Sequence, residues 1–214
     1  EGTLVVGGDL VVDAPLVLGQ SVVELRHGAR LLGQNASLDR LRIVAYPGKA
    51  SVRMDALGGV GTQFEITPGA RLELVGGGLV LLPNAVTLDG ALEVRAPASL
   101  ALKATSTLTV APTGRLALLG NTATTANLQA YVAGGYQVVV QGTFAARHFV
   151  LRDMGAFTFA PASALGVEGL HAGRVERGLA AGGGALLDLG FAPAADCVGI
   201  DFVGGLVPVF GDAF

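Results

Sequence analysis

The sequence predicts an all-β fold, a right-handed parallel β-helix (solenoid) of about ten coils with roughly 20–22 residues each and almost no α-helix. Three observations support this prediction. Related segments recur at a nearly constant spacing, apolar residues alternate in short runs, and 33 glycines accompany only 14 % charged residues. Small residues suit the tight corners between strands, and low charge suits a surface made mostly of sheet.

Three segments share a short alternating strand, a turn, and an arginine followed by leucine. They are Val23–Gly33, Phe64–Gly76 and Leu108–Gly120. Their arginines, Arg30, Arg71 and Arg115, recur at a nearly constant interval. Weaker echoes divide each interval in two, which gives a coil of roughly 20–22 residues, as in solenoid repeats.

The expected strands are short, as in residues 4–6, 72–74, 92–94 and 116–118. Alternation with a period of two places one side of a strand in a core and the other side outside. No window has the apolar spacing and caps of a helix. A β-sandwich would use longer strands and more hairpin turns than this sequence contains, so the β-helix fits better.

We expect a single β-solenoid domain over residues 1–214. Residues 1–120 contain regular coils rich in leucine and valine, residues 121–137 a protruding loop, and residues 138–214 coils richer in phenylalanine and glycine. The polar run Asn121–Asn127 marks the loop.

Composition and motifs exclude several classes of function. The net charge of −3 argues against a nucleic-acid surface, and no uninterrupted apolar run is long enough to predict a membrane span. Cys197 is the single cysteine, so no internal disulfide forms. His27, His148 and His171 lack neighbours at metal-ligand spacing. We therefore expect no metal, no cofactor, no catalytic residues and no enzymatic activity.

The second half contains three further coil-like segments, Glu168–Gly178, Gly182–Leu189 and Val198–Phe202. Their pattern resembles the coils of large secreted bacterial right-handed parallel β-helix repeat proteins of the adhesin-like or extracellular scaffold type. The resemblance implies an extracellular or cell-surface location and a structural or binding role. We expect a subunit or segment of a surface fibre, stalk or adhesin.

Neither end of the sequence has the pattern of a solenoid cap, and an uncapped coil exposes strand edges and core side chains. We expect self-association through residues at both ends: Leu4, Val5, Val6, Val209, Phe210 and Phe214. The expected partners are copies of the chain packed head to tail, or adjoining segments of a longer chain, together with surface glycans.

Two alternative functions use other residues. A carbohydrate-active β-helix enzyme, a polysaccharide lyase or hydrolase, needs carboxylates held close together, with arginines nearby in a lyase. The candidates are Asp153, Glu176, Asp188, Asp196, Asp201, Arg147, Arg152, Arg174 and Arg177. A monomeric glycan-binding module would use the loop around Asn121–Asn127 as its contact surface.

Arg30, Arg71 and Arg115 follow the turn at the same place in each repeat, so they line one edge of the solenoid if the coils stack in phase. Such a row is either a spaced, solvated set of charges or a binding stripe for an anionic polymer. Glu73 and Glu93 are placed to neutralise it.

Overall fold

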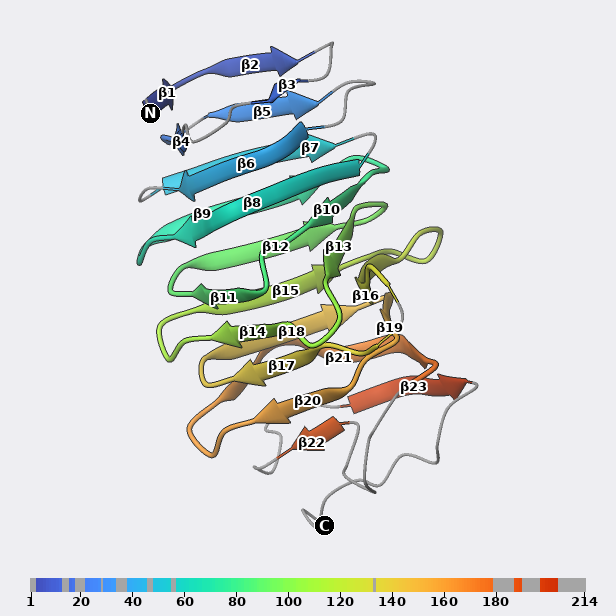
Figure 1. Cartoon of the computed structure of the whole chain (residues 1–214). Helices are drawn as coiled ribbons and strands as arrows, with labels where there is room; N and C mark the ends of the chain where they lie inside the picture. Colours follow the sequence, from blue (N-terminus) through green and yellow to red (C-terminus); the bar gives the residue numbers. More distant parts are fainter. Residues whose placement is uncertain are drawn as a thin grey trace.

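The computed structural model describes residues 3–12, 16–17, 22–27, 29–33, 38–45, 48–54, 57–132, 134–178, 187–189 and 197–203. These residues form a β-solenoid whose coils run across three stacked faces, with some long strands that span two of the faces (Figure 1). All strand pairings between them are parallel, as in β1 with β4 and β12 with β15, and none of them lies in a helix. The predicted fold class is confirmed, while the right-handed winding stays a prediction.

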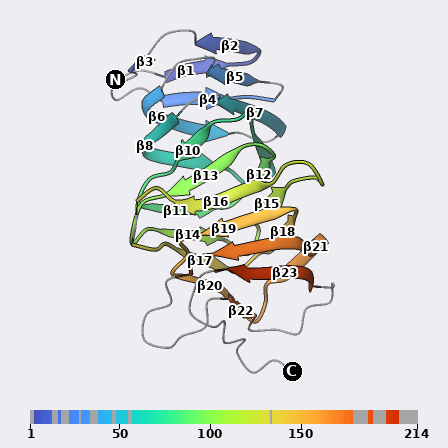
Figure 2. The same cartoon turned by 90° about the vertical axis from the view of Figure 1, so that its right-hand side faces the viewer.

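The strands stack into three faces along the solenoid axis (Figures 1 and 2). Face I contains β2 (Asp9–Val12), β5 (Arg30–Gly33), β7 (Gly48–Met54), β9 (Ala70–Val75), β12 (Ala91–Arg95), β15 (Arg115–Leu119), β18 (Thr143–Arg147) and the starts of β21 (Ala164–Glu176) and β23 (Cys197–Val203).

Face II contains β3 (Leu16–Val17), the starts of β6 (Leu38–Ala45) and β8 (Leu57–Ile66), β10 (Leu79–Leu81), β13 (Ser99–Leu102), β16 (Ala126–Ala130), β19 (Phe149–Arg152) and the ends of β21 and β23. Face III contains β1 (Thr3–Val6), β4 (Val22–Leu25), the ends of β6 and β8, β11 (Ala85–Leu88), β14 (Thr107–Val110), β17 (Gln137–Val140), β20 (Ala156–Phe159) and β22 (Leu187–Leu189).

The register of face I gives the coil length directly. The successive partners at its centre are Asp9, Arg30, Ser51, Glu73 and Glu93, so the first coils have the predicted length. The next partners are Ala117 and Ala145, and each of these two steps along the chain is longer than the one before it. Because of these longer coils, the described part of face I holds nine strands, fewer than the ten coils expected.

The core consists of apolar side chains stacked on the same position of neighbouring coils. One row on face I runs through Leu72, Leu92, Leu116 and Phe144, and all four side chains are buried. In-register stacking removes each side chain from water on both coil-facing sides, which is the main stabilising contribution in a solenoid. The period-two pattern of the sequence thus identifies the core.

Larger side chains enter the core in the second half of the chain. Phe144, Phe157 and Phe159 form an aromatic cluster with ring centroids 4.7–5.9 Å apart. Tyr136 is also fully buried, and its hydroxyl donates a hydrogen bond to the Leu128 carbonyl oxygen at 3.1 Å. Burial, followed by the charge of Asp153, raises the pKa of Tyr136 well above its ordinary value.

Glycine is required at the corner between faces III and I. Gly90, Gly114 and Gly142 precede strands that stack in register, β12, β15 and β18. A Cβ atom at Gly114 would overlap the Leu88 carbonyl oxygen, and one at Gly142 would overlap the Ala111 carbonyl oxygen. Part of the glycine content therefore reflects close approach of backbone to backbone.

Within the stretch 121–137, residues 126–130 form β16 in face II. The preceding residues 121–125 and the following residues Tyr131 and Val132 are exposed. The side-chain Oδ1 atom of Asn121 accepts hydrogen bonds from the backbone N–H groups of Ala123 and Thr124, at 2.9 and 3.0 Å. None of the described residues belongs to a helix capable of spanning a membrane.

Candidate functional sites

Charged side chains form a ladder on the outer side of face I. They alternate along each strand with apolar side chains that point into the core. The charged ladder contains Lys49, Arg71, Glu73, Glu93, Arg95, Arg115 and Glu168. Glu73 and Glu93 are direct register partners in the middle of the face. In-register stacking thus places two carboxylates side by side, an arrangement that requires cations around them.

Glu93 is the most buried member, with 2 % of its side chain exposed. Its carboxylate lies 2.7 Å from Arg71, 2.9 Å from Arg95 and 3.7 Å from Arg115, measured between oxygen and nitrogen. These arginines come from three successive strands, β9, β12 and β15. A carboxylate buried this deeply is tolerated because its cationic partners offset the loss of hydration.

Glu73 has the same kind of environment. Lys49 lies 3.1 Å from its carboxylate, Arg95 lies 3.0 Å away and Arg71 lies 3.1 Å away. Burial acts to raise the pKa of Glu73, but the hydrogen bonds and charges of Lys49 and Arg95 outweigh it and leave that pKa below its ordinary value. Glu73 is therefore ionised at neutral pH.

A bulge in β21 supplies the last member of the ladder. β21 pairs with β18 up to Leu165 and again from Leu170, so residues 166–169 bulge out of the sheet of face I. Both Glu168 carboxylate oxygens accept hydrogen bonds from Arg115 Nη2, at 2.9 and 2.8 Å. Burial acts to raise the pKa of Glu168. The hydrogen bond from its own backbone N–H and the charge of Arg115 act in the opposite direction and outweigh burial, so the pKa of Glu168 lies below its ordinary value.

The bulge also covers apolar surface on the outer side of face I. Ala117, Leu119 and Ala145 form a small cluster there, separate from the main core. Gly166 lies directly against the Ala145 side chain, where a Cβ atom on the glycine would come within 3.0 Å. The Arg115–Glu168 ion pair therefore holds the bulge over this cluster.

The three repeat arginines lie on the same face but not in one row. Arg71 and Arg115 share a row, with Ala91 between them on β12. Arg30 is instead the register partner of Ser51, which pairs with Glu73. The row of Arg30 is therefore displaced by two residues along the strand from the row of Arg71. Its ionic partner is Asp9 on the neighbouring coil. The expectation of a single row is wrong for Arg30. From the register partners Val23, Ile43 and Phe64 on face III, the chain takes one residue more in each coil to reach the row of Arg30, Ser51 and Glu73.

The carboxylates considered for catalysis are distributed over different faces. Asp153 forms an ion pair with Arg177 at 2.7 Å, and Glu176 forms one with Arg152 at 2.8 Å. Asp153 and Glu176 lie on neighbouring coils. Asp188 belongs to β22 on face III and Asp201 to β23 on face II. The fold does not bring Asp188 and Asp201 onto one face, and Asp196 lies outside the described residues.

The histidines have ordinary surroundings. The His27 Nδ1 atom accepts a hydrogen bond from the backbone N–H of Lys49 at 3.1 Å, and His148 occupies a corner with φ of 45°. Across the described ranges, no three His, Cys, Asp or Glu side chains gather as a metal site would require.

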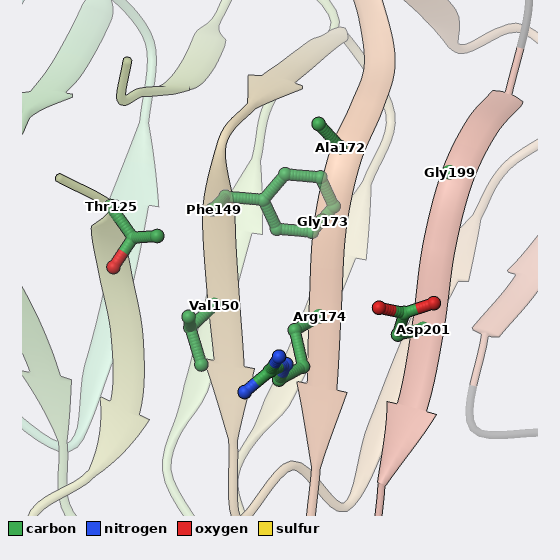
Figure 3. A pocket seen from close by; sticks show the side chains of 8 residues that line it. All are labelled: Thr125, Phe149, Val150, Ala172, Gly173, Arg174, Gly199 and Asp201. Carbon is green, nitrogen blue, oxygen red and sulfur yellow. The ribbon is translucent and has the colours of Figure 1, made fainter. Parts of the chain in front are cut away.

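A groove crosses the last coils of face II (Figure 3). Its volume is about 410 Å³, and its lining residues are Thr125, Phe149, Val150, Ala172, Gly173, Arg174, Gly199 and Asp201. Arg174 and Asp201 are register partners on β21 and β23, and both are exposed. Two of its lining residues, Ala172 and Gly199, have positive φ, which the strand pattern of the sequence does not indicate.

The predicted self-association residues at the first coil have different environments. Leu4 and Val5 are exposed, whereas Val6 is buried. Leu4 is the partner of Val23, which is fully buried, so an inward-facing position becomes accessible at this coil. Val209, Phe210 and Phe214 lie outside the described residues.

A scan against protein-family models, a search of curated proteins and a search of solved structures each found no match to the chain.

Proposed function

We propose that the chain is an extracellular structural protein, a subunit or segment of a surface fibre, stalk or adhesin that extends by packing coil on coil. One observation carries the proposal. Among the described residues, β1, β2 and β3 each pair with a single strand, and the apolar side chains Leu4, Val5 and Val11 are exposed beside their other edges. An open edge next to exposed apolar side chains is suited to receive another coil.

The contact joins unlike ends, because the first coil of one solenoid meets the last coil of another. Such a heterologous contact does not close and generates a linear polymer. An adjoining segment of a longer chain would occupy the same edge in the same way. The exposed Val198 and Val203 on β23 offer apolar side chains at the opposite end of the described stack.

Negative-stain electron microscopy over a concentration series tests this proposal. We expect unbranched fibres with an axial repeat of roughly 45 Å, since each coil adds about 4.8 Å. Leu4→Lys places a charge at the open end and is expected to abolish the fibres. Val132→Lys is the matched control, because Val132 is an exposed apolar residue between β16 and β17. Short rods that never associate would overturn the proposal.

The groove on face II favours a second candidate function, a carbohydrate-active enzyme. A carboxylate (Asp201) and a guanidinium (Arg174) lie on adjacent strands beside the apolar Val150, the kinds of group that a sugar site combines. Cleavage of acidic and neutral polysaccharides is the test, with reducing ends or unsaturated products as the readout. Loss of a measured activity in Asp201→Asn but not in Asp89→Asn would support it, and no activity on any polysaccharide would exclude it.

A further inference from the structure

The charged ladder presents cations to solvent and keeps its acids underneath. The side chains of Lys49, Arg71, Arg95 and Arg115 are 31–55 % exposed, whereas those of the three glutamates are 2–22 % exposed. A molecule that approaches face I from outside therefore meets guanidinium and ammonium groups first. The chain is acidic overall, but this face has the opposite character.

The face also has more cations than carboxylates. Arg147 is exposed at the end of β18 and forms no ion pair within the described part of the chain, although its charge acts on Glu168. It extends the ladder, because Leu119 pairs with both Arg95 and Arg147. With Arg147, five cations face three carboxylates. The surplus is available for an external anion.

Two arginines of the ladder retain unused donors. The Nε atoms of Arg71 and Arg115 are buried, and neither has a hydrogen-bond partner among the described residues. These two arginines share one row, with Ala91 between them. These buried atoms are out of reach of an external anion, so an anionic oxygen over Ala91 would meet the exposed parts of the two guanidinium groups, whose side chains are 41 and 31 % exposed.

The spacing of the cations is regular along the solenoid axis. Arg71 and Arg115 lie two coils apart, and so do Arg95 and Arg147, which corresponds to roughly 9.6 Å at the usual strand separation. Ala91 keeps the surface low between Arg71 and Arg115, whereas the bulge at residues 166–169 covers Ala117 and Ala145. Such a surface fits an extended polymer with a carboxylate or sulfate at regular intervals, since guanidinium groups bind these anions bidentately.

The outer positions of β7, β9, β12, β15 and β18 contain no aromatic side chain among the described residues. Proteins that bind single-stranded nucleic acids use aromatic side chains to stack the bases. From these observations we infer that the charged ladder, with Arg147, binds an extended anionic polysaccharide lying along the solenoid axis. This inference does not depend on end-to-end assembly, because the ladder lies on a side face.

Binding is measured by isothermal titration with polygalacturonate and dextran sulfate as probes and with neutral dextran as the reference. We expect Lys49→Gln/Arg147→Gln to weaken binding about tenfold, because two exposed cations are removed without uncovering Glu93. Lys103→Gln/Arg177→Gln is the matched control, since it lowers the net charge equally at exposed positions away from face I. Lys49→Arg/Arg147→Lys is expected to retain the binding.

Three results would overturn the inference. The first is binding of the Lys49→Gln/Arg147→Gln variant as tight as that of the unchanged chain. The second is an equal loss in the Lys103→Gln/Arg177→Gln control, which would show a response to net charge alone. The third is an equal affinity for an oligothymidylate, which would indicate a nucleic-acid surface. Far-ultraviolet circular dichroism confirms that each variant is folded, and none of these results bears on fibre formation.

Discussion

Glu73 and Glu93 are register partners on adjacent strands of face I, and the cation of Arg95 bridges them, 3.0 Å from Glu73 and 2.9 Å from Glu93. Arg71 bridges the same pair from the other side, at 3.1 and 2.7 Å. The two carboxylates and the two guanidinium groups thus form one network of alternating charges. Removal of any one member leaves an unbalanced charge in a partly buried place.

Glu93→Gln is expected to lower the free energy of unfolding by about 2–4 kcal/mol, because Arg71, Arg95 and Arg115 lose their shared counter-charge. Urea denaturation followed by circular dichroism measures the change. Asp89, whose side chain forms no ion pair within the described part of the chain, supplies the control, and Asp89→Asn is expected to change the free energy by less than about 0.5 kcal/mol. Equal stability of the two variants would show that the network contributes nothing.

Stability is expected to fall in acid. The folded-state pKa values of Glu73, Glu168 and Glu176 are lowered, so the unfolded chain takes up protons at a higher pH than the folded chain does. Their contribution is complete above the unfolded pKa of about 4.3 and is lost as the pH falls through the lower folded values. Thermal unfolding between pH 7 and pH 3 measures this, and Glu168→Gln should flatten the acid limb. An unchanged Tm throughout that range contradicts the prediction.

Gly114→Ala is expected to destabilise the fold by about 1–3 kcal/mol, because the new methyl group would overlap the Leu88 carbonyl oxygen on the neighbouring coil. Gly77 is the matched glycine, since no atom lies within 4 Å of its Cβ position. Gly77→Ala should leave stability unchanged or raise it slightly. Chemical denaturation measures the free energy of unfolding of both variants. An equal change in both would show that alanine acts through the unfolded chain and not through the contact with Leu88.

Glu168→Ala is expected to release the bulge at residues 166–169 while the coils stay folded, because it removes the hydrogen bonds to Arg115. Hydrogen–deuterium exchange should accelerate in the peptides that cover the bulge and β15, and stay slow in β12. Val167→Ser is the control, since Val167 is 98 % exposed. Unchanged exchange in Glu168→Ala would mean that the glycines alone fix the bulge.

The fold was largely predictable, because in-register stacking repeats the same alternation in every coil. The rows through Leu72, Leu92 and Leu116 follow directly from that alternation. The coil count was less accurate, since a repeat length taken from the regular first half does not foresee the longer coil that separates Ala117 from Ala145.

The charged ladder was predictable in part. Arg71, Arg115 and the neutralising Glu73 and Glu93 are all readable from the repeat, because they occupy fixed places in it. Glu168 was not, since it reaches Arg115 from a distant part of the chain through a bulge that interrupts the alternation. The groove on face II was missed for a similar reason: corners with positive φ and an exposed register pair on separate coils leave no periodic signal.

The Arg115–Glu168 ion pair joins β15 to β21, two strands that have β18 between them. A solenoid held together only by neighbouring coils can unzip one coil at a time from its end. A link that skips a coil makes the removal of β21 depend on β15 as well. This region should therefore detach as one block under mechanical load, so that a pulling experiment would record a single larger rupture where three small steps are otherwise expected.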